Sequence, residues 1–230
     1  MQYEELLPAE FNEIFQRAPV AYLPWAALEW HGYHMALGND GLKAHGILQR
    51  VAEKTGGVVL PPIWCGFDTL KLDSHGGFPL TLEFKRETVM QLLTEYLEQL
   101  SDIGFKLIVV LSGHYGPPHI AALVEAANLF TIWQTQRQTR VWIIPEYDLV
   151  TDLGYRGDHA AKWETAILMH LRPELVDLTR LDDRTAGAEG GILGEDPRQA
   201  ATPELGGRIV EAIVQRLAER VEKYLAVGHE

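Results

Sequence analysis

The alternation of short apolar runs with helical patterns constrains the fold of this chain more than any other feature of its sequence. The apolar runs are aliphatic and β-branched without polar interruption, which is typical of strands buried on both faces of a parallel sheet. They are Pro19–Pro24, Gly57–Pro62, Phe105–Leu111 and Arg140–Pro145. Apolar residues at helical spacing follow in Leu42–Lys54, Lys85–Ile103, Pro117–Trp133 and Glu204–Val227. The pattern predicts an α/β fold, a three-layer α/β/α domain with a mostly parallel central sheet.

The one long loop in this pattern does not divide the chain into domains. Residues 179–207 are rich in Gly, Asp and Arg and too long for a simple connection, and loops of that length are usually functional. The single helix after this loop could not fold alone. We therefore expect one domain over residues 1–230.

Composition excludes several classes of protein. The chain has 20 Lys and Arg against 32 Asp and Glu, a formal charge of −12, which disfavours binding to nucleic acid or to anionic membranes. The single cysteine, Cys65, excludes an intramolecular disulfide framework and a cysteine-rich zinc site. No apolar run is long enough for a membrane span, and the acidic N-terminus lacks a secretion signal, so a cytoplasmic location is expected.

Three clusters of chemistry-bearing residues follow predicted strands, where open parallel sheets bind their ligands. The first holds Glu29, His31 and Asp40. Glu29 and His31 are two residues apart, so in extended backbone both side chains point to one side. Two carboxylates and an imidazole are suitable ligands for Zn²⁺ or Mn²⁺, although a polar loop with a capping aspartate would explain the same residues.

The second and third clusters are shorter. Ser112-Gly113-His114 ends the strongest predicted strand and would project its imidazole into the same crevice, or cap the following helix. His159 and Glu164 lie near the start of a helix that Asp158 would cap. A glutamate there also complements the helix dipole, which is an alternative explanation for Glu164.

If the three clusters converge, they bring together enough carboxylates and imidazoles for two metal ions. One carboxylate bridges such ions, which lie about 3.5–4 Å apart, and Asp40 is the natural bridge. A hydroxide held by the two ions would attack a carbonyl carbon. His159 would then protonate the leaving nitrogen.

The motifs resemble those of the creatininase (creatinine amidohydrolase) family. Residues 29–34 with Asp40 resemble its E-Q-H-G-P-H…D signature, and residues 112–114 resemble its N-G-H turn. Residues 157–165 resemble its H-A-G-x-x-E-T segment, and residues 194–201 its G-D-P-x-x-A stretch. The four motifs occur in the expected order between about residues 20 and 220.

The resemblance implies a binuclear metal site and a hexamer built as a trimer of dimers. It assigns Glu29, His31, Asp40 and His114 as metal ligands, with Asp40 as the bridge. Creatininase has N-G-H-Y-E-N, whose glutamate completes the second metal, whereas this chain has Gly116 at that position. Glu164 is then expected to replace the missing ligand. His159, with Asp158 beside it, is assigned to catalysis.

The resemblance also implies an enzyme that hydrolyses a small polar substrate. We expect an amidohydrolase that acts on a cyclic amide or formamide with two divalent ions, Zn, Mn or Fe. The alternatives are a ring-opening hydrolase of an oxidised inositol, a peptidase of peptide-cofactor maturation, and a non-catalytic binding protein. Aromatic and histidine side chains near the motifs are expected to contact the substrate, although packing would also explain them. They are Trp30, Tyr33, His75, Tyr115 and Trp163.

Overall fold

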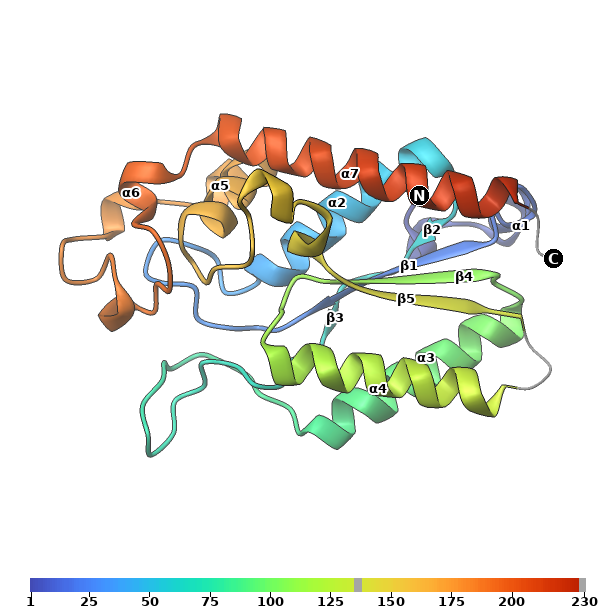
Figure 1. The fold of residues 1–230 in the computed structure, drawn as a ribbon, viewed down its shortest axis with the longest axis horizontal. Helices are drawn as coiled ribbons and strands as arrows, with labels where there is room; N and C mark the ends of the chain where they lie inside the picture. Colours follow the sequence, from blue (N-terminus) through green and yellow to red (C-terminus); the bar gives the residue numbers. More distant parts are fainter. Residues whose placement is uncertain (135–137, 228–230) are drawn as a thin grey trace.

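A parallel β-sheet forms the centre of the protein (Figure 1). The computed structural model describes residues 1–134 and 138–227. The strand order is β2-β1-β4-β5, with β3 paired to the end of β1. Every pair is parallel. The strands are β1 (Val20–Ala26), β2 (Val58–Val59), β3 (Ile63–Trp64), β4 (Leu107–Ser112) and β5 (Arg140–Pro145).

The second predicted strand is shorter than expected. The run Gly57–Pro62 gives only the two residues of β2, and pairing with β1 resumes beyond the run, at Ile63, after Pro61 and Pro62. Proline has no N–H to donate to a neighbouring strand, so it interrupts the ladder. The other three predicted strands agree with β1, β4 and β5 to within two residues at each end.

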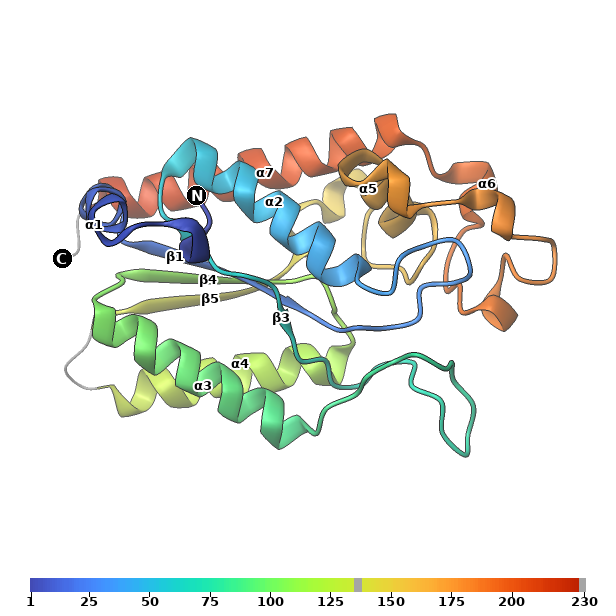
Figure 2. The ribbon, with the colours of Figure 1, turned by 180° about the vertical axis from the view of Figure 1, so that it is seen from behind.

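Helices cover both faces of the sheet (Figures 1 and 2). One layer contains α2, α5 and α7, and the other contains α3 and α4. The helices are α1 (Pro8–Arg17), α2 (Asn39–Thr55), α3 (Arg86–Ile103), α4 (Pro117–Trp133), α5 (Lys162–Leu171), α6 (Pro197–Ala200) and α7 (Pro203–Ala226). Short 3₁₀ turns lie at Tyr3–Glu5, Glu146–Leu149, Thr151–Leu153, Pro173–Leu175, Leu178–Arg180 and Ala188–Gly190.

Two hydrophobic cores lie on opposite faces of β1, which is buried along its whole length. Val20 and Tyr22 belong to the core beneath α2 and α7. Leu23 and Trp25 belong to the core against α3 and α4. Successive strand residues point to opposite faces, so a strand that is apolar throughout needs a helical layer on each side. This arrangement confirms the predicted three-layer α/β/α fold.

Two irregular segments extend beyond the carboxyl ends of the strands (Figure 1). One joins β3 to α3 and protrudes as a hairpin-like loop. The other joins α5 to α7 and contains α6, whose first turn is capped by Asp196. In the part of the chain that the structure describes, no helix is both long and apolar enough to cross a membrane. The prediction of one domain over residues 1–230 is not tested by these observations.

Candidate metal centre

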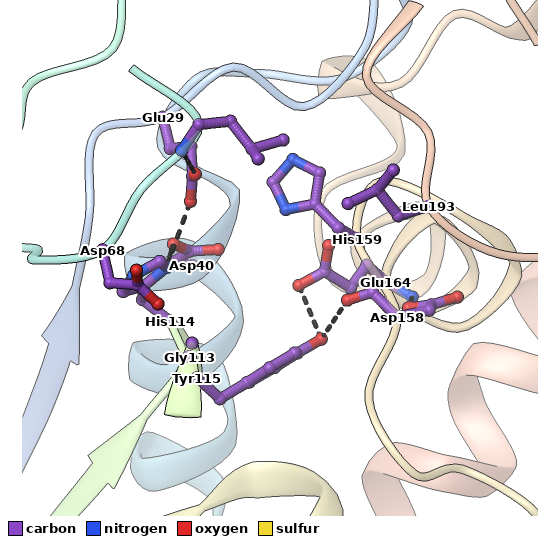
Figure 3. Close-up of a pocket in the computed structure, with 12 residues that line it drawn as sticks. Glu29, Asp40, Asp68, Gly113, His114, Tyr115, Asp158, His159, Glu164 and Leu193 are labelled. Carbon is purple, nitrogen blue, oxygen red and sulfur yellow. Dashed lines mark hydrogen bonds and ion pairs between the residues drawn. The ribbon is translucent and has the colours of Figure 1, made fainter. Parts of the chain in front are cut away.

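The three sequence clusters meet at one edge of the sheet, beyond the carboxyl ends of β1 and β4 (Figure 3). Glu29 and His31 follow β1, His114 follows β4, and Asp40 lies in the first turn of α2. Glu164 comes from the first turn of α5. Parallel strands bring their carboxyl ends to the same edge, so residues distant in sequence gather there. All five side chains are buried.

The first group joins Glu29, Asp40 and His114. Nδ1 of His114 lies 3.1 Å from Oε2 of Glu29 and 3.6 Å from Oδ2 of Asp40. The other ring nitrogen, Nε2, donates a hydrogen bond of 2.9 Å to the backbone carbonyl of Phe67. A carbonyl oxygen only accepts, so this bond fixes the proton on Nε2 and directs Nδ1 toward the carboxylates. Metal-ligating histidines are commonly oriented in this way.

The second group joins His31, Asp40 and Glu164. Nε2 of His31 lies 2.9 Å from Oδ1 of Asp40 and 3.6 Å from Oε2 of Glu164. Nδ1 of His31 donates to the backbone carbonyl of Glu29 at 3.0 Å. Asp40 therefore belongs to both groups and turns a different oxygen to each histidine. This is the arrangement that a bridging carboxylate requires.

Three buried polar atoms of these groups have no hydrogen-bond partner among the described residues. They are Oε2 of Glu29, Nε2 of His31 and Oδ2 of Asp40. Each has an oppositely charged group within ion-pair distance, but none makes a hydrogen bond of acceptable geometry. Buried polar atoms are almost always hydrogen-bonded, so such exceptions need an explanation. Divalent cations would satisfy all three, and this donor set of oxygen and imidazole nitrogen suits them.

The charges of the site also favour a cation. Burial by itself would lower the pKa of His31, but Asp40, Glu164 and Glu29 outweigh it and raise that pKa to about 10. The pKa of His114 is likewise raised to about 9, against the effect of burial, by Glu29 and Asp40. In the metal-free protein these histidines hold protons because buried carboxylates surround them. A bound divalent ion would take over that role and release the protons.

His159 lies outside α5, paired with Leu193 through backbone hydrogen bonds. Its Nε2 donates to the carbonyl of Trp30 at 2.7 Å, and its ring stacks on His31 with centroids 4.4 Å apart. Burial and the neighbouring His31 lower the pKa of His159. The ring is thus a neutral imidazole at the cavity wall, with the proton on Nε2 and Nδ1 available to accept one. It also forms a possible ligand group with Glu29 and His31.

Asp158 is placed to cap helix α5. Its carboxylate accepts hydrogen bonds from the backbone N–H groups of Trp163 at 2.8 Å and Glu164 at 3.2 Å. Burial, with the nearby charge of Glu164, raises the pKa of Asp158 to about 7. The side chain also lines the cavity. Its predicted catalytic role stays a prediction.

The cavity beside these groups has a volume of about 230 Å³. In Figure 3, Glu29, Asp40 and His114 face His159 and Glu164 across it, with Tyr115 below. Of the five predicted substrate-binding residues, Tyr115 lines this cavity. A space of this size fits a small ligand rather than a folded macromolecule.

The other four predicted substrate-binding residues are not part of this cavity's wall. Trp30 stacks on Phe78 and contacts Tyr33 edge-on, and Tyr33 is 51% exposed. Trp163 stacks on Tyr155. The His75 side chain is 90% exposed on the segment between β3 and α3. Substrate contact by these four residues stays a prediction.

The structure adds residues that the sequence patterns did not single out. Lys43 is fully buried and lies 2.6 Å from Oε1 of both Glu146 and Glu164. The one available signal concerns Glu146, which directly follows a strand, as the residues of the three clusters do. Asp68 also lines the cavity.

Asp68 lies directly against residue 116. A Cβ at Gly116 would lie 2.8 Å from Oδ2 of Asp68 and 3.0 Å from its backbone oxygen, so any larger residue requires the Asp68 carboxylate to move. The segment between β3 and α3 therefore fills the space that a side chain at position 116 would need. A glutamate cannot stand there without displacing Asp68.

Comparisons with known proteins agree with this geometry. The profile of the creatininase family, described as creatinine amidohydrolase, matches residues 4–221. The creatinine amidohydrolase of Pseudomonas putida is 26% identical over 231 residues, 89% of each chain. The mycofactocin precursor peptide peptidase of Mycolicibacterium smegmatis is 27% identical over 239 residues, 93% of this chain and 88% of that protein.

A solved structure of creatininase superposes with a TM-score of 0.83 at 27% identity, over 96% of both chains. Other solved creatininases that superpose equally well include one described with Mn and a variant described as the Zn–Zn type. The carboxylate and histidine groups at the edge of this sheet form a candidate metal centre. The chain belongs to the creatininase family, which confirms the prediction of an amidohydrolase-type enzyme.

Proposed function

We propose that this protein hydrolyses an amide-type C–N bond in a small polar substrate with the help of two divalent cations. The observation that carries the proposal is the position of Asp40, which contributes one oxygen to each of two ligand groups. Glu29 and His114 complete one group, and His31 and Glu164 complete the other. The solved creatininases described with Mn and with Zn support divalent ions of this kind.

Two divalent cations in these groups would activate a water molecule and polarise the substrate carbonyl. The protein's own residues hold and move the proton. Nε2 of His159 is tied to the carbonyl of Trp30, so Nδ1 is the atom that accepts a proton from the attacking water. The lowered pKa of His159 keeps the ring neutral and ready for this step. The same ring then returns the proton to the leaving nitrogen.

The cavity limits the substrate to a small one. Its 230 Å³ is lined by carboxylates, histidines and the phenol ring of Tyr115, with Leu70 and Leu193 as an apolar part of the wall. The part of the substrate that faces the ligand groups is therefore polar, and the leucines can contact an apolar part of it. Asp68 also stands at this wall, and its carboxylate can accept a hydrogen bond from an N–H of the substrate. A cyclic amide or a formamide meets these conditions.

Peptide cleavage is the second candidate. The mycofactocin peptidase is as similar in identity and coverage as the creatinine amidohydrolase. A peptide would have to enter with only its terminal residue in the small cavity. Hydrolysis of a keto-inositol is the third candidate, because the 3-dehydro-scyllo-inosose hydrolase of Thermotoga maritima is 26% identical over 49% of this chain.

A substrate screen on metal-loaded protein tests the proposal. Metal-stripped protein is reloaded with Mn²⁺ or Zn²⁺ and incubated with cyclic amides, formamides, short peptides and keto-inositols, and products are read by mass spectrometry. Hydrolysis of an amide or formamide that requires added metal is the expected result. Hydrolysis of peptides alone, or of keto-inositols alone, would replace the amide assignment. The hexamer and the cytoplasmic location stay predictions, and light scattering would test the former.

A further inference from the structure

Lys43 places a positive charge in the interior beside the candidate metal centre. Of the Lys and Arg residues in the part of the chain described, it alone is fully buried. Its Nζ donates to Oε1 of Glu146 and to Oε1 of Glu164, both at 2.6 Å. Burying an ammonium is costly unless it is paired in good geometry. The two short hydrogen bonds meet that condition, and one of them joins the ammonium of Lys43 to Glu164, a proposed metal ligand.

The ion pairs are part of a ring of polar contacts. The hydroxyl of Tyr155 donates to Oε1 of Glu146 at 2.8 Å, and the hydroxyl of Tyr115 donates to Oε1 of Glu164 at 2.8 Å, with the carbonyl of Asp158 also 2.9 Å away. Both phenol protons are then in use, so the two hydroxyl oxygens are in contact at 2.9 Å without a hydrogen bond between them, and Lys43 links the two glutamates. Groups from α2, α5 and the segments after β4 and β5 are thereby held in one arrangement.

This ring restricts how Glu164 can point. Lys43 and Tyr115 both bind Oε1, while Oε2 accepts from the backbone N–H of Ala160 at 2.7 Å and lies 3.6 Å from Nε2 of His31. Rotating the carboxylate would break bonds on both oxygens. Only Oε2 is left to face the group that contains His31 and Asp40.

We propose that Lys43, held in place by Glu146, is a positioning residue that directs Oε2 of Glu164 toward His31 and Asp40. The third member of this group is a carboxylate that comes from α5. Lys43 itself does not touch the reacting atoms; it acts through Glu164. The inference rests on the proposed two-cation function.

A positioning role and a purely electrostatic role have opposite consequences. An ammonium beside a ligand carboxylate repels cations, so on charge alone its removal would tighten metal binding. If Lys43 positions Glu164, its removal frees the carboxylate and weakens binding at that group. Whether the metal affinity rises or falls when Lys43 is removed therefore separates the two roles.

The test uses the double variant Lys43→Met, Glu146→Gln. It removes one positive and one negative charge, so the net charge of the cluster is unchanged, while the hydrogen bond that holds Oε1 of Glu164 to Lys43 is lost. Loss of the nearer, positive charge would by itself favour metal binding, so weaker binding reports the lost restraint. The matched control is Lys162→Met, Glu195→Gln, which removes another lysine–glutamate pair, 3.0 Å apart and partly exposed, outside the centre. Metal-stripped proteins are titrated with Mn²⁺ by calorimetry. The binding event that is lost in the variant Glu164→Gln identifies the site formed by His31, Asp40 and Glu164, which is called the second site below.

We expect the double variant to weaken the second site by about 10- to 100-fold, the usual range for outer-shell partners. The first site, with Glu29 and His114, should change by less than about 3-fold, which is under 1 kcal/mol. The control variant should bind both ions as the unmodified protein does. Unchanged affinities, equal weakening at both sites, or tighter binding at the second site would each overturn the proposal.

A crystal structure of the metal-stripped double variant gives a second readout. The expected result is Oε2 of Glu164 turned away from His31, and an unchanged 3.6 Å separation would overturn the proposal. If the unmodified protein binds fewer than two ions, the two-cation function fails. The orientation of Glu164 in the stripped variant still decides whether Lys43 positions it.

Discussion

Oδ1 of Asp40 lies 2.9 Å from Nε2 of His31, and both side chains are buried. Its other oxygen, Oδ2, turns toward His114 at 3.6 Å and has no hydrogen-bond partner among the described residues. One carboxylate thus belongs to both of the groups that are proposed to hold the two ions. Loss of this carboxylate should therefore affect both ions together.

Replacing Asp40 by asparagine should reduce the affinity for both ions by more than about 100-fold, since even outer-shell partners are worth about 10- to 100-fold. Metal-dependent turnover should fall with it. Elemental analysis after gel filtration measures the metal content. Asp177→Asn is the control, because Asp177 is an exposed turn residue that binds the backbone of Thr179. Full metal content and turnover in Asp40→Asn would refute the bridging role.

Replacing His159 by glutamine should lower kcat by about 10²- to 10⁴-fold, the usual contribution of general acid–base catalysis, with metal content unchanged. His170→Gln serves as the control, since His170 is an exposed histidine near the end of α5, the helix that follows His159. His159 also belongs to a possible ligand group with Glu29 and His31. If metal content fell together with kcat, His159 would be a ligand rather than a proton carrier.

Asp158 should contribute to stability through the cap of α5. Asp158→Ala removes the acceptor for two backbone N–H groups and should lower the free energy of unfolding by about 1 kcal/mol, the usual cost of losing a cap. Asp158→Asn keeps an acceptor oxygen and should lose less than half as much in urea denaturation at pH 8. Equal losses in both variants would show that charge, not capping, is what Asp158 supplies.

The metal-stripped protein should become less stable as the pH rises. The pKa values of His31 and His114 are raised from the ordinary 6.5 to about 10 and about 9. A group with a raised pKa stabilises the folded state fully below its unfolded value, and this contribution is lost as the pH rises through the folded value. Thermal unfolding in EDTA should therefore show Tm falling between about pH 6.5 and 10.

The variant His31→Asn, His114→Asn should flatten this fall, because it lacks both titrating groups. Protein saturated with Zn²⁺ should not show the fall, since its ligand histidines are already deprotonated. A Tm in EDTA that stays level or rises over this range would contradict the charge balance described for the site.

The sequence predicts the layers and the clustered motifs well, because both depend on local patterns. Continuous apolar runs specify buried parallel strands, and the carboxyl ends of such strands collect Glu29, His31 and His114 at one edge. The apolar pattern Gly57–Pro62 does not indicate that β2 ends at Val59 or that β3 follows at Ile63, because it does not show how Pro61 and Pro62 interrupt the ladder.

The sequence does not reveal which polar residues meet across the centre. Lys43 lies on a helix face that also carries apolar core residues, and nothing local distinguishes it from a solvent-exposed lysine. Its partner Glu146 is 103 residues away. The exposed position of His75 was also not foreseen, because a loop's composition does not specify where its tip points.

Anomalous diffraction from crystals grown with Mn²⁺ tests the central claim most directly. The account predicts two manganese peaks about 3.5–4 Å apart, with one oxygen of Asp40 on each ion. One ion should also contact Glu29 and His114, and the other His31 and Glu164. A single peak at full Mn²⁺ occupancy, or two peaks that Asp40 does not bridge, would contradict it.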